Sequence, residues 1–440
     1  MKNILFLDRN YLFKHIKSEK YNSIFVSLKE SGRKELESLG QNVVGCFESQ
    51  YSDLEVADFV DDYLLYSYDS DRFLNRFSFE KRREILGKEI SFWCAILDKY
   101  KPVCIVSEVV TIEWMEVLYI EARRRNIPYH SFLYGFNKGY CYWLDNPFNS
   151  EISSTRWTNL KIENSHKLMA REFFDGVRDK HAKPYYIQNV NYSNIKSLLS
   201  GIRYYCREYY HKVKQKGFVY EYYSEAAVDM INRGVKSMYK KHDSLDDINT
   251  NNHEYLFYPL HYEPEATLSY FSEYYSNQLN NICNIAHSLN TNQVLIVKEH
   301  PQQINMLLLD KYSRLKKTYK NVLYIRGDVS SYDIFKKISA IVTLTGTGGI
   351  EGMILGIPVI TLGHVFYNYC ESTNVCRNMV ELKNMIRKKT YKKPDPAKIL
   401  SFLEHFFALT ERGYAYSKYI GDKDENYRAL CAKLEIFLTD

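Results

Sequence analysis

A glycine-rich loop between an apolar run and a helical pattern is the strongest chemical signal in the sequence. The run IVTLT ends in Thr345, and Gly346, Thr347, Gly348 and Gly349 follow it. Glycines let backbone N–H groups approach a ligand closely, and the start of a helix favours a phosphate. Glu351 in the first helical turn could accept hydrogen bonds from a ribose, or could cap its own helix. No lysine follows the glycines, so the loop is not of the Walker A type.

Two further polar corners follow apolar runs. The run VLIV (294–297) leads into Lys298, Glu299, His300 and Pro301. Pro301 favours an extended conformation at His300, which could aim the imidazole across a cleft, where His300 and Lys298 could meet a phosphate. The alternative is a histidine whose ring is bonded to the backbone. After YLFYPL, a third corner begins at His261 and could close over the same ligand.

The apolar run VCIVS ends in Glu108. A carboxylate at the end of a strand could act as general base on a hydroxyl group, and burial would raise its pKa into a useful range. Glu113 fits better as a residue that complements the dipole of the following helix. The acids between Asp61 and Asp71 suggest a solvated loop rather than a metal site. We therefore predict no metal and no cofactor.

The elements that must position these residues alternate between strand and helix patterns, which predicts an α/β fold with parallel sheets. In such sheets, ligands bind beyond the carboxyl ends of the strands. We predict an N-terminal Rossmann-like domain, a basic, tyrosine-rich helical linker, a second Rossmann-like domain that binds the nucleotide, and C-terminal helices. These regions span residues 1–160, 161–252, 253–395 and 396–440.

The composition narrows the classes of partner. The chain has 440 residues with 45% hydrophobic and 25% charged residues, as globular proteins do. A net charge of +6 is mild, so we expect no nucleic-acid partner. The stretch Ile202–Lys216 could lie on an anionic membrane surface, or could be a linker helix with a solvated face. The first residues indicate a strand rather than a signal peptide, and nine scattered cysteines without a CxxC pair suit reduced thiols in the cytoplasm.

These motifs together resemble the capsule polysaccharide biosynthesis family, which includes bacterial β-Kdo transferases. The resemblance lies in VLIVKEHP and in Asp328–Tyr367, and extends to FYPLHYEPEATLS (257–269) and Val106–Tyr129. It implies a GT-B architecture, in which two Rossmann-like domains face each other across a cleft and the second holds most of the nucleotide sugar.

The resemblance also implies roles for individual residues. His300 would contact the donor phosphate, Glu351 would hold the ribose, and Glu108 would be the base. The phosphate would be cradled by Thr345, Thr347 and Gly348. The donor would be a CMP-activated sugar such as Kdo or sialic acid, and the acceptor a saccharide or glycolipid of a capsule or lipopolysaccharide.

The chain departs from its relatives at two places. Many relatives carry an arginine after the strand that here reads IPY, and this chain has Lys138 in that region. Many also carry glutamine where this chain has His261. Both differences affect which sugar and which acceptor the family pattern would imply.

We expect direct, inverting, metal-independent transfer, with His300, Lys298 and the Thr-Gly loop stabilising the departing phosphate. Two alternatives share the architecture, namely a nucleotide-sugar 2-epimerase and a transferase of polyol phosphate from CDP-glycerol or CDP-ribitol. A third is a non-catalytic protein that binds or assembles polysaccharide, because a fold does not by itself determine an activity.

Overall fold

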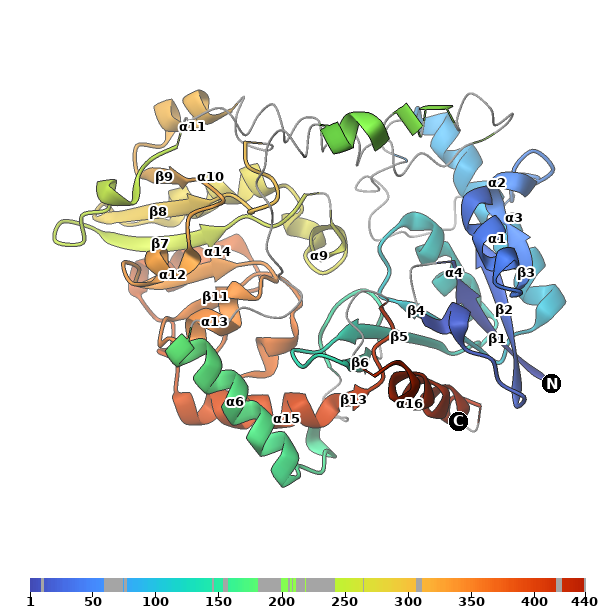
Figure 1. Ribbon diagram of the computed structural model, residues 1–440. Helices are drawn as coiled ribbons and strands as arrows, with labels where there is room; N and C mark the ends of the chain where they lie inside the picture. The colour runs from blue at the N-terminus through green and yellow to red at the C-terminus, as the bar shows by residue number, and fades with distance from the viewer. Residues whose placement is uncertain are drawn as a thin grey trace. The chain divides into compact units, whose positions relative to one another are not determined.

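The computed structural model divides into two compact units (Figure 1). Unit 1 comprises Met1–Phe148, Glu208–Tyr223 and Leu409–Asp440, and unit 2 comprises Asn149–Arg207 and Ser224–Ala408. The structure describes residues 1–8, 12–58, 74, 77–144, 146–152, 157–180, 199–204, 206–207, 209–210, 218, 242–263, 265–305, 311–416 and 422–438.

Unit 1 is built on a seven-stranded sheet in the order β13-β6-β5-β4-β1-β2-β3. Five strands are parallel: β1 (Lys2–Leu7), β2 (Tyr21–Ser27), β3 (Asn42–Cys46), β4 (Cys104–Glu108) and β5 (Tyr129–Tyr134). Two antiparallel strands extend the β5 edge: β6 (Tyr140–Leu144) and β13 (Thr410–Arg412). The central strands are apolar, and Leu5, which pairs with Ile24 and Ile105, is fully buried, as is usual for parallel strands.

Helices α3 (Phe79–Tyr100) and α4 (Glu113–Arg124) contain the largest buried side chains of unit 1. The rings of Trp93 and Trp114 lie 4.6 Å apart, and the indole N–H of Trp93 donates to the carbonyl of Trp114 at 3.0 Å. Helix α3 begins at Ser78, whose side chain accepts from the N–H of Lys81, and ends at Lys101 in the left-handed conformation. The other helices are η1 (Leu12–His15), α1 (Glu30–Ser38), α2 (Phe47–Gln50) and α16 (Lys423–Ile436).

Unit 2 contains a six-stranded, parallel sheet in the order β12-β11-β10-β7-β8-β9. The strands are β7 (Glu254–Pro259), β8 (Gln293–Lys298), β9 (Val322–Ile325), β10 (Ala340–Thr343), β11 (Val359–Thr361) and β12 (Asn374–Val375). The chain adds β8 and β9 on one side of β7 and then crosses to place β10 on the other side. The strand order therefore reverses between β7 and β10, as it does between β1 and β4 in unit 1. Such a switch point is where open α/β sheets bind ligands.

The helices of unit 2 pack on the sheet around an apolar core in which Leu256, Leu295 and Val342 are fully buried. Helix α6 also contacts α13. The described α-helices and 3-10 helices of unit 2 are α6 (Asn164–Lys180), η4 (Leu245–Asp247), α9 (Ala266–Ser269), η5 (Glu273–Tyr275), α10 (Gln278–Ser288), α11 (Tyr312–Thr318), α12 (Ser331–Phe335), α13 (Gly348–Ile354), η6 (Phe366–Tyr369), α14 (Met379–Lys388) and α15 (Pro396–Leu409).

The prediction of an α/β chain with two Rossmann-like domains is confirmed, but two local predictions were wrong. The sequence over 268–289, LSYFSEYYSNQLNNICNIAHSL, has a pattern that predicts one helix, whereas the chain forms the end of α9, then η5 and α10. Asn277 starts α10 afresh because its side chain accepts from the N–H of Asn280. The last region is not all helical, since β13 pairs with β6 and returns the chain from Leu409 onward to unit 1.

Two stretches discussed from the sequence fall wholly or mostly outside the described residues. The acids from Asp61 to Asp71 are among them, and so is most of Ile202–Lys216, although Tyr209 and Tyr210 are described and exposed. Across the described part of the chain, no helix has both the length and the apolar character needed to cross a membrane.

The nine cysteines are free thiols in very different environments, which gives a first prediction. Burial raises the pKa of Cys104 and of Cys141 to about 12, whereas Cys206 is exposed. Since the thiolate is the reactive species, we expect a maleimide at pH 8 to label Cys206 in the native protein and to label Cys104 and Cys141 only after denaturation. Peptide mass spectrometry over time measures this, and fast native labelling of Cys104 or Cys141 would contradict the fold.

Candidate functional site

The loops that follow β7 and β10 are joined across the switch point of unit 2. The N–H of Thr345 donates to Nε2 of His261 at 3.2 Å. A Cβ on Gly346 would lie 3.4 Å from the same nitrogen, so the glycine lets the β10 loop pack closely on the imidazole. The structure therefore brings His261 and the predicted Thr-Gly loop together, at the edge of the sheet where a ligand is expected.

His261 is held in one protonation state and one tautomer. Burial, and then the charge of nearby His300, lower the pKa of His261 to about 3, so the ring is neutral at pH 7. Because Nε2 accepts the N–H of Thr345, the single proton of the neutral ring lies on Nδ1. His261 is only 8% exposed, and Nδ1 contacts no hydrogen-bond partner among the described residues.

The side chain of Thr345 is in the same situation. Its Oγ1 is buried and has no hydrogen-bond partner within the described part of the chain. A buried polar atom without a partner costs about 1–3 kcal/mol, so each one calls for an explanation, such as a bound ligand or water. Two of them on residues that are hydrogen-bonded to each other indicate a binding site at this switch point.

Tyr367 of η6 holds the Thr-Gly loop in place. The phenol of Tyr367, which is fully buried, donates to the carbonyl of Gly346 at 2.7 Å. A Cβ on Gly349 would overlap that hydroxyl, whereas a Cβ on Gly348 would meet only the ring of Phe335 at 4.0 Å. Packing therefore requires a glycine at position 349, whereas position 348 has room for a Cβ.

The corner after β8 is also firmly held. Lys298 ends the strand and is buried. The carboxylate of Glu299 contacts Nε2 of His242 at 2.8 Å and accepts the N–H of Asn305 at 2.9 Å. Nδ1 of His300 accepts the N–H of Gln302 at 3.2 Å, so its proton in the neutral ring lies on Nε2. His300 is therefore bonded to the backbone and also close enough to His261 to affect its pKa.

Two glutamines hold the loop after β7 and were not recognised from the sequence. Gln278 accepts the N–H of His261 at 2.7 Å and donates to its carbonyl at 3.1 Å. Gln303 makes the same pair of backbone bonds to Glu263, accepting at 2.7 Å. Since these partners lie 17 and 40 positions apart, no local pattern could have revealed them.

Glu351 lies close to Tyr332 of α12 and Tyr367 of η6. It is only 7% exposed, and its charge adds to burial in raising the pKa of the Tyr332 and Tyr367 phenols. As the fourth residue of α13, it lies one residue beyond the position that closes a capping box. The simple capping interpretation of Glu351 therefore does not fit its place in the helix.

Glu108 belongs to unit 1, whereas the other predicted site residues belong to unit 2. It ends β4 at the switch point between β1 and β4 and is partly exposed. Nearby Glu113 is buried and forms an ion pair with Arg82 of α3 at 3.4 Å, so it joins α4 to α3. This agrees with a structural rather than a catalytic role for Glu113.

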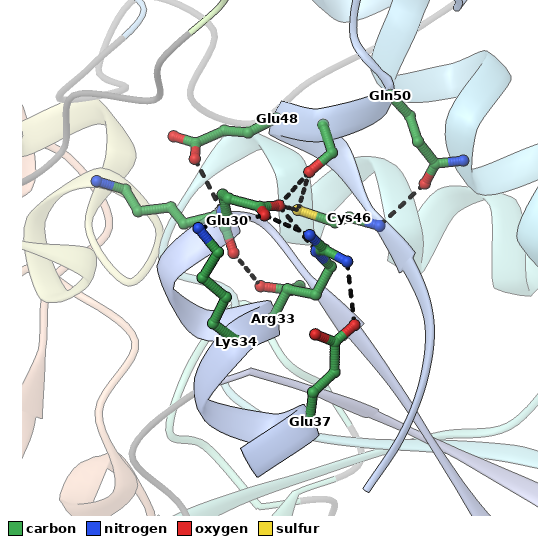
Figure 2. Close-up of polar contacts among 10 residues, drawn as sticks. Glu30, Arg33, Lys34, Glu37, Cys46, Glu48 and Gln50 are labelled. Carbon is green, nitrogen blue, oxygen red and sulfur yellow. Dashed lines mark hydrogen bonds and ion pairs between the residues drawn. The ribbon is translucent and has the colours of Figure 1, made fainter. Parts of the chain in front are cut away.

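At the carboxyl edge of the same sheet, a polar network surrounds the start of α1 (Figure 2). Glu48 accepts the backbone N–H of Glu30 at 2.9 Å, and Glu30 pairs with Arg33. The hydrogen bond from Arg33 in particular lowers the pKa of Glu30 to about 2. Burial raises the pKa of Cys46, beside Glu30, to about 11, so this thiol is protonated at neutral pH and is a poor nucleophile. We assign the network to the attachment of α1 to β3 and α2.

Over the described residues, no three His, Cys, Asp or Glu side chains converge in a way that could hold a metal ion. The expectation of a site without metal or cofactor stays a prediction.

Part of the chain matches a known protein family. Residues 176–392 match the family described as capsule polysaccharide biosynthesis protein. No curated protein sequence matches the chain.

Among solved structures, the chain is similar to KpsC of Thermosulfurimonas dismutans, a β-Kdo 2,4 transferase. The identity is 13% over 75% of this chain and 87% of that one, with a TM-score of 0.40. It is also similar to S. aureus MnaA with UDP, at 12% identity over 100% and 97% of the chains and a TM-score of 0.31. Anabaena HepE with UDP-glucose is similar at 8% identity over 99% and 100%, with a TM-score of 0.32.

The contrast between the two loop glycines gives a prediction. Gly349→Ala should displace the Tyr367 hydroxyl from Gly346 and destabilise unit 2 by about 1–3 kcal/mol, whereas Gly348→Ala should leave stability unchanged. Thermal unfolding of both variants beside the wild type measures this. Equal midpoints for Gly349→Ala and the wild type would show that Tyr367 does not brace the loop.

Proposed function

We propose that this chain, whose residues 176–392 match the capsule polysaccharide biosynthesis family, is a glycosyltransferase. It moves a sugar from a nucleotide donor to a growing bacterial surface polysaccharide. The observation that carries the proposal is the pair of buried, unpartnered polar atoms at the switch point of unit 2, Nδ1 of His261 and Oγ1 of Thr345, judged over the described residues.

Both atoms suit the phosphate of a nucleotide sugar. His261 presents an N–H donor that stays neutral well below pH 7, and Thr345 presents a hydroxyl that can donate. Phosphate oxygens are strong acceptors, and a dry site strengthens such bonds. Backbone N–H groups of the Thr-Gly loop, with Lys298 and His300 at the neighbouring strand end, would add donors and positive charge. Glu351 would hold the ribose.

In the reaction we propose, the donor is CMP-activated and transfer is direct, inverting and independent of metal. The acceptor hydroxyl, from a saccharide or glycolipid, attacks the anomeric carbon as the bond from that carbon to the phosphate oxygen breaks. Glu108 takes the proton of the hydroxyl. Preorganised donors around the leaving phosphate are worth roughly 3 kcal/mol each in well-built sites.

The role of Glu108 can be separated from donor binding. Glu108→Gln should reduce the turnover number by roughly 10²–10⁴-fold, because a general base is lost. The same variant should bind nucleotide as the wild type does, because Glu108 belongs to the other unit. Unchanged turnover would remove Glu108 from the mechanism without affecting the nucleotide site.

Donor binding is tested by calorimetry with CMP, UMP, GDP and CDP-glycerol, without metal. We expect CMP to bind best, and Thr345→Val to weaken it by about tenfold or more, because a hydrogen bond to a charged group is lost. Since Oγ1 makes no hydrogen bond to any residue that the structure describes, Thr345→Val should fold with equal or greater stability. Thr345→Ser keeps the hydroxyl and is the matched control, so it should retain affinity.

The outcomes of this panel distinguish the alternatives. A preference for uridine nucleotides would favour a different sugar donor or the epimerase, and a preference for CDP-glycerol the polyol-phosphate transferase. If folded wild-type protein bound no nucleotide, the proposal would fail and a non-catalytic assembly protein would replace it.

A further inference from the structure

His364 lies at the same edge of the unit 2 sheet as the Thr-Gly loop, three residues after the end of β11. The preceding Gly363 packs so closely on Thr345 that a Cβ would lie 2.7 Å from its Cγ2. The N–H of Gly363 donates to the carbonyl of Leu344 at 3.2 Å, and that of His364 donates to Phe271 at 2.7 Å. The backbone of His364 is therefore fixed beside the residue that would contact the donor phosphate.

The imidazole of His364 is paired with a carboxylate that is itself held in place. Nδ1 of His364 lies 3.3 Å from Oε2 of Glu151. The amide of Asn368 donates to the other oxygen of Glu151 at 2.8 Å and to the carbonyl of Gly363 at 2.9 Å. The hydroxyl of Thr361 donates to Oδ1 of Asn368 at 2.8 Å, which completes a chain from β11 to the imidazole.

The two partners differ in exposure and in charge. The side chain of His364 is 65% exposed and that of Glu151 is 28% exposed. Burial acts to raise the pKa of Glu151, but the bonds from His364 and Asn368, with the positive charge of His364 and Arg377, outweigh it and lower that pKa. Glu151 is thus an anion that stabilises the imidazolium form of His364, and Arg377 is the positive charge that opposes this effect.

We propose that His364, oriented by Glu151, is the general acid of the glycosyl transfer. This inference rests on the proposed function, in which a phosphate leaves at Thr345. As the bond from the anomeric carbon to the phosphate oxygen breaks, Nε2 of the imidazolium gives its proton to that oxygen. The Nδ1–H group stays hydrogen-bonded to Glu151. The acceptor oxygen forms its bond to the anomeric carbon and loses its proton to the base, Glu108. His364 regains a proton from solvent before the next turnover.

The arrangement matches what a proton donor needs. One ring nitrogen is held by a fixed carboxylate, which sets the tautomer and supports the charged form, so the other nitrogen carries the proton that is transferred. The alternative is that His364 and Glu151 only attach residues 149–152 to the loop after β11. Ser150 already makes this attachment, since its Oγ accepts the N–H of Phe366 at 3.1 Å. Variants of His364 should therefore keep the fold.

The test uses CMP as probe and compares the wild type with His364→Gln from pH 6 to pH 9 by calorimetry. The glutamine cannot be charged. We expect the wild type to bind CMP about tenfold more tightly than the variant at pH 6 and equally at pH 9, because only the imidazolium makes a charged bond to the phosphate. The titration of CMP itself affects both proteins alike. A purely structural role would give a ratio that does not change with pH, and this result would overturn the proposal.

A second measurement needs no substitution at His364. In histidine-labelled protein, NMR should show that bound CMP raises the pH at which His364 titrates, and that Glu151→Gln lowers it in the free protein. The resonance of His287, which lies in the last turn of α10 at the opposite edge of the sheet, is the internal control and should not respond to CMP. If CMP binds and His364 does not respond, this inference fails while the proposed function stands. If no nucleotide binds, the proposed function fails and this inference fails with it.

Discussion

The hydrogen bond from the N–H of Thr345 to Nε2 of His261 is the interaction on which the candidate site depends. It joins two loops that are 84 residues apart in the chain and adjacent only because the strand order reverses between β7 and β10. The same bond fixes the imidazole tautomer, so it determines which atom His261 can offer to a ligand. Without it, the proton of the neutral His261 ring would not be confined to Nδ1.

The surrounding residues stabilise this bond from several directions. Gln278 holds the backbone of His261 at both its N–H and its carbonyl, and Tyr367 holds the carbonyl of Gly346. The close approach of Gly363 to Thr345 connects β11 to the same loop. These contacts come from α10, from η6 and from the segment after β11. They stabilise the loops enough to hold Nδ1 of His261 and Oγ1 of Thr345 in place, although neither atom has a hydrogen-bond partner among the described residues.

Much of the architecture could be predicted from local patterns. Strands such as 294–297 and 103–107 are apolar runs bounded by polar residues, because parallel strands are buried on both faces. The corners at His261, His300 and Thr345 could be predicted as candidate site residues because ligands bind beyond the carboxyl ends of parallel strands. The patterns failed where tertiary contacts override local preference, as at Asn277, which divides a predicted helix, and at Thr410–Arg412, which joins β6 instead of extending a helix.

The sequence by itself determined which residue types stand at which strand ends, since hydrophobic periodicity and the positions of glycine and proline are local properties. It could not determine which of these ends meet. The tertiary structure decided that His261 is a neutral donor rather than a cation, because burial and the Thr345 N–H act through space. It also decided that Glu351 lies close to Tyr332 and Tyr367, and that Glu151 contacts His364, which is more than 200 residues away in the chain. Such pairings are tertiary contacts between residues far apart in the chain, so no local sequence pattern can predict them.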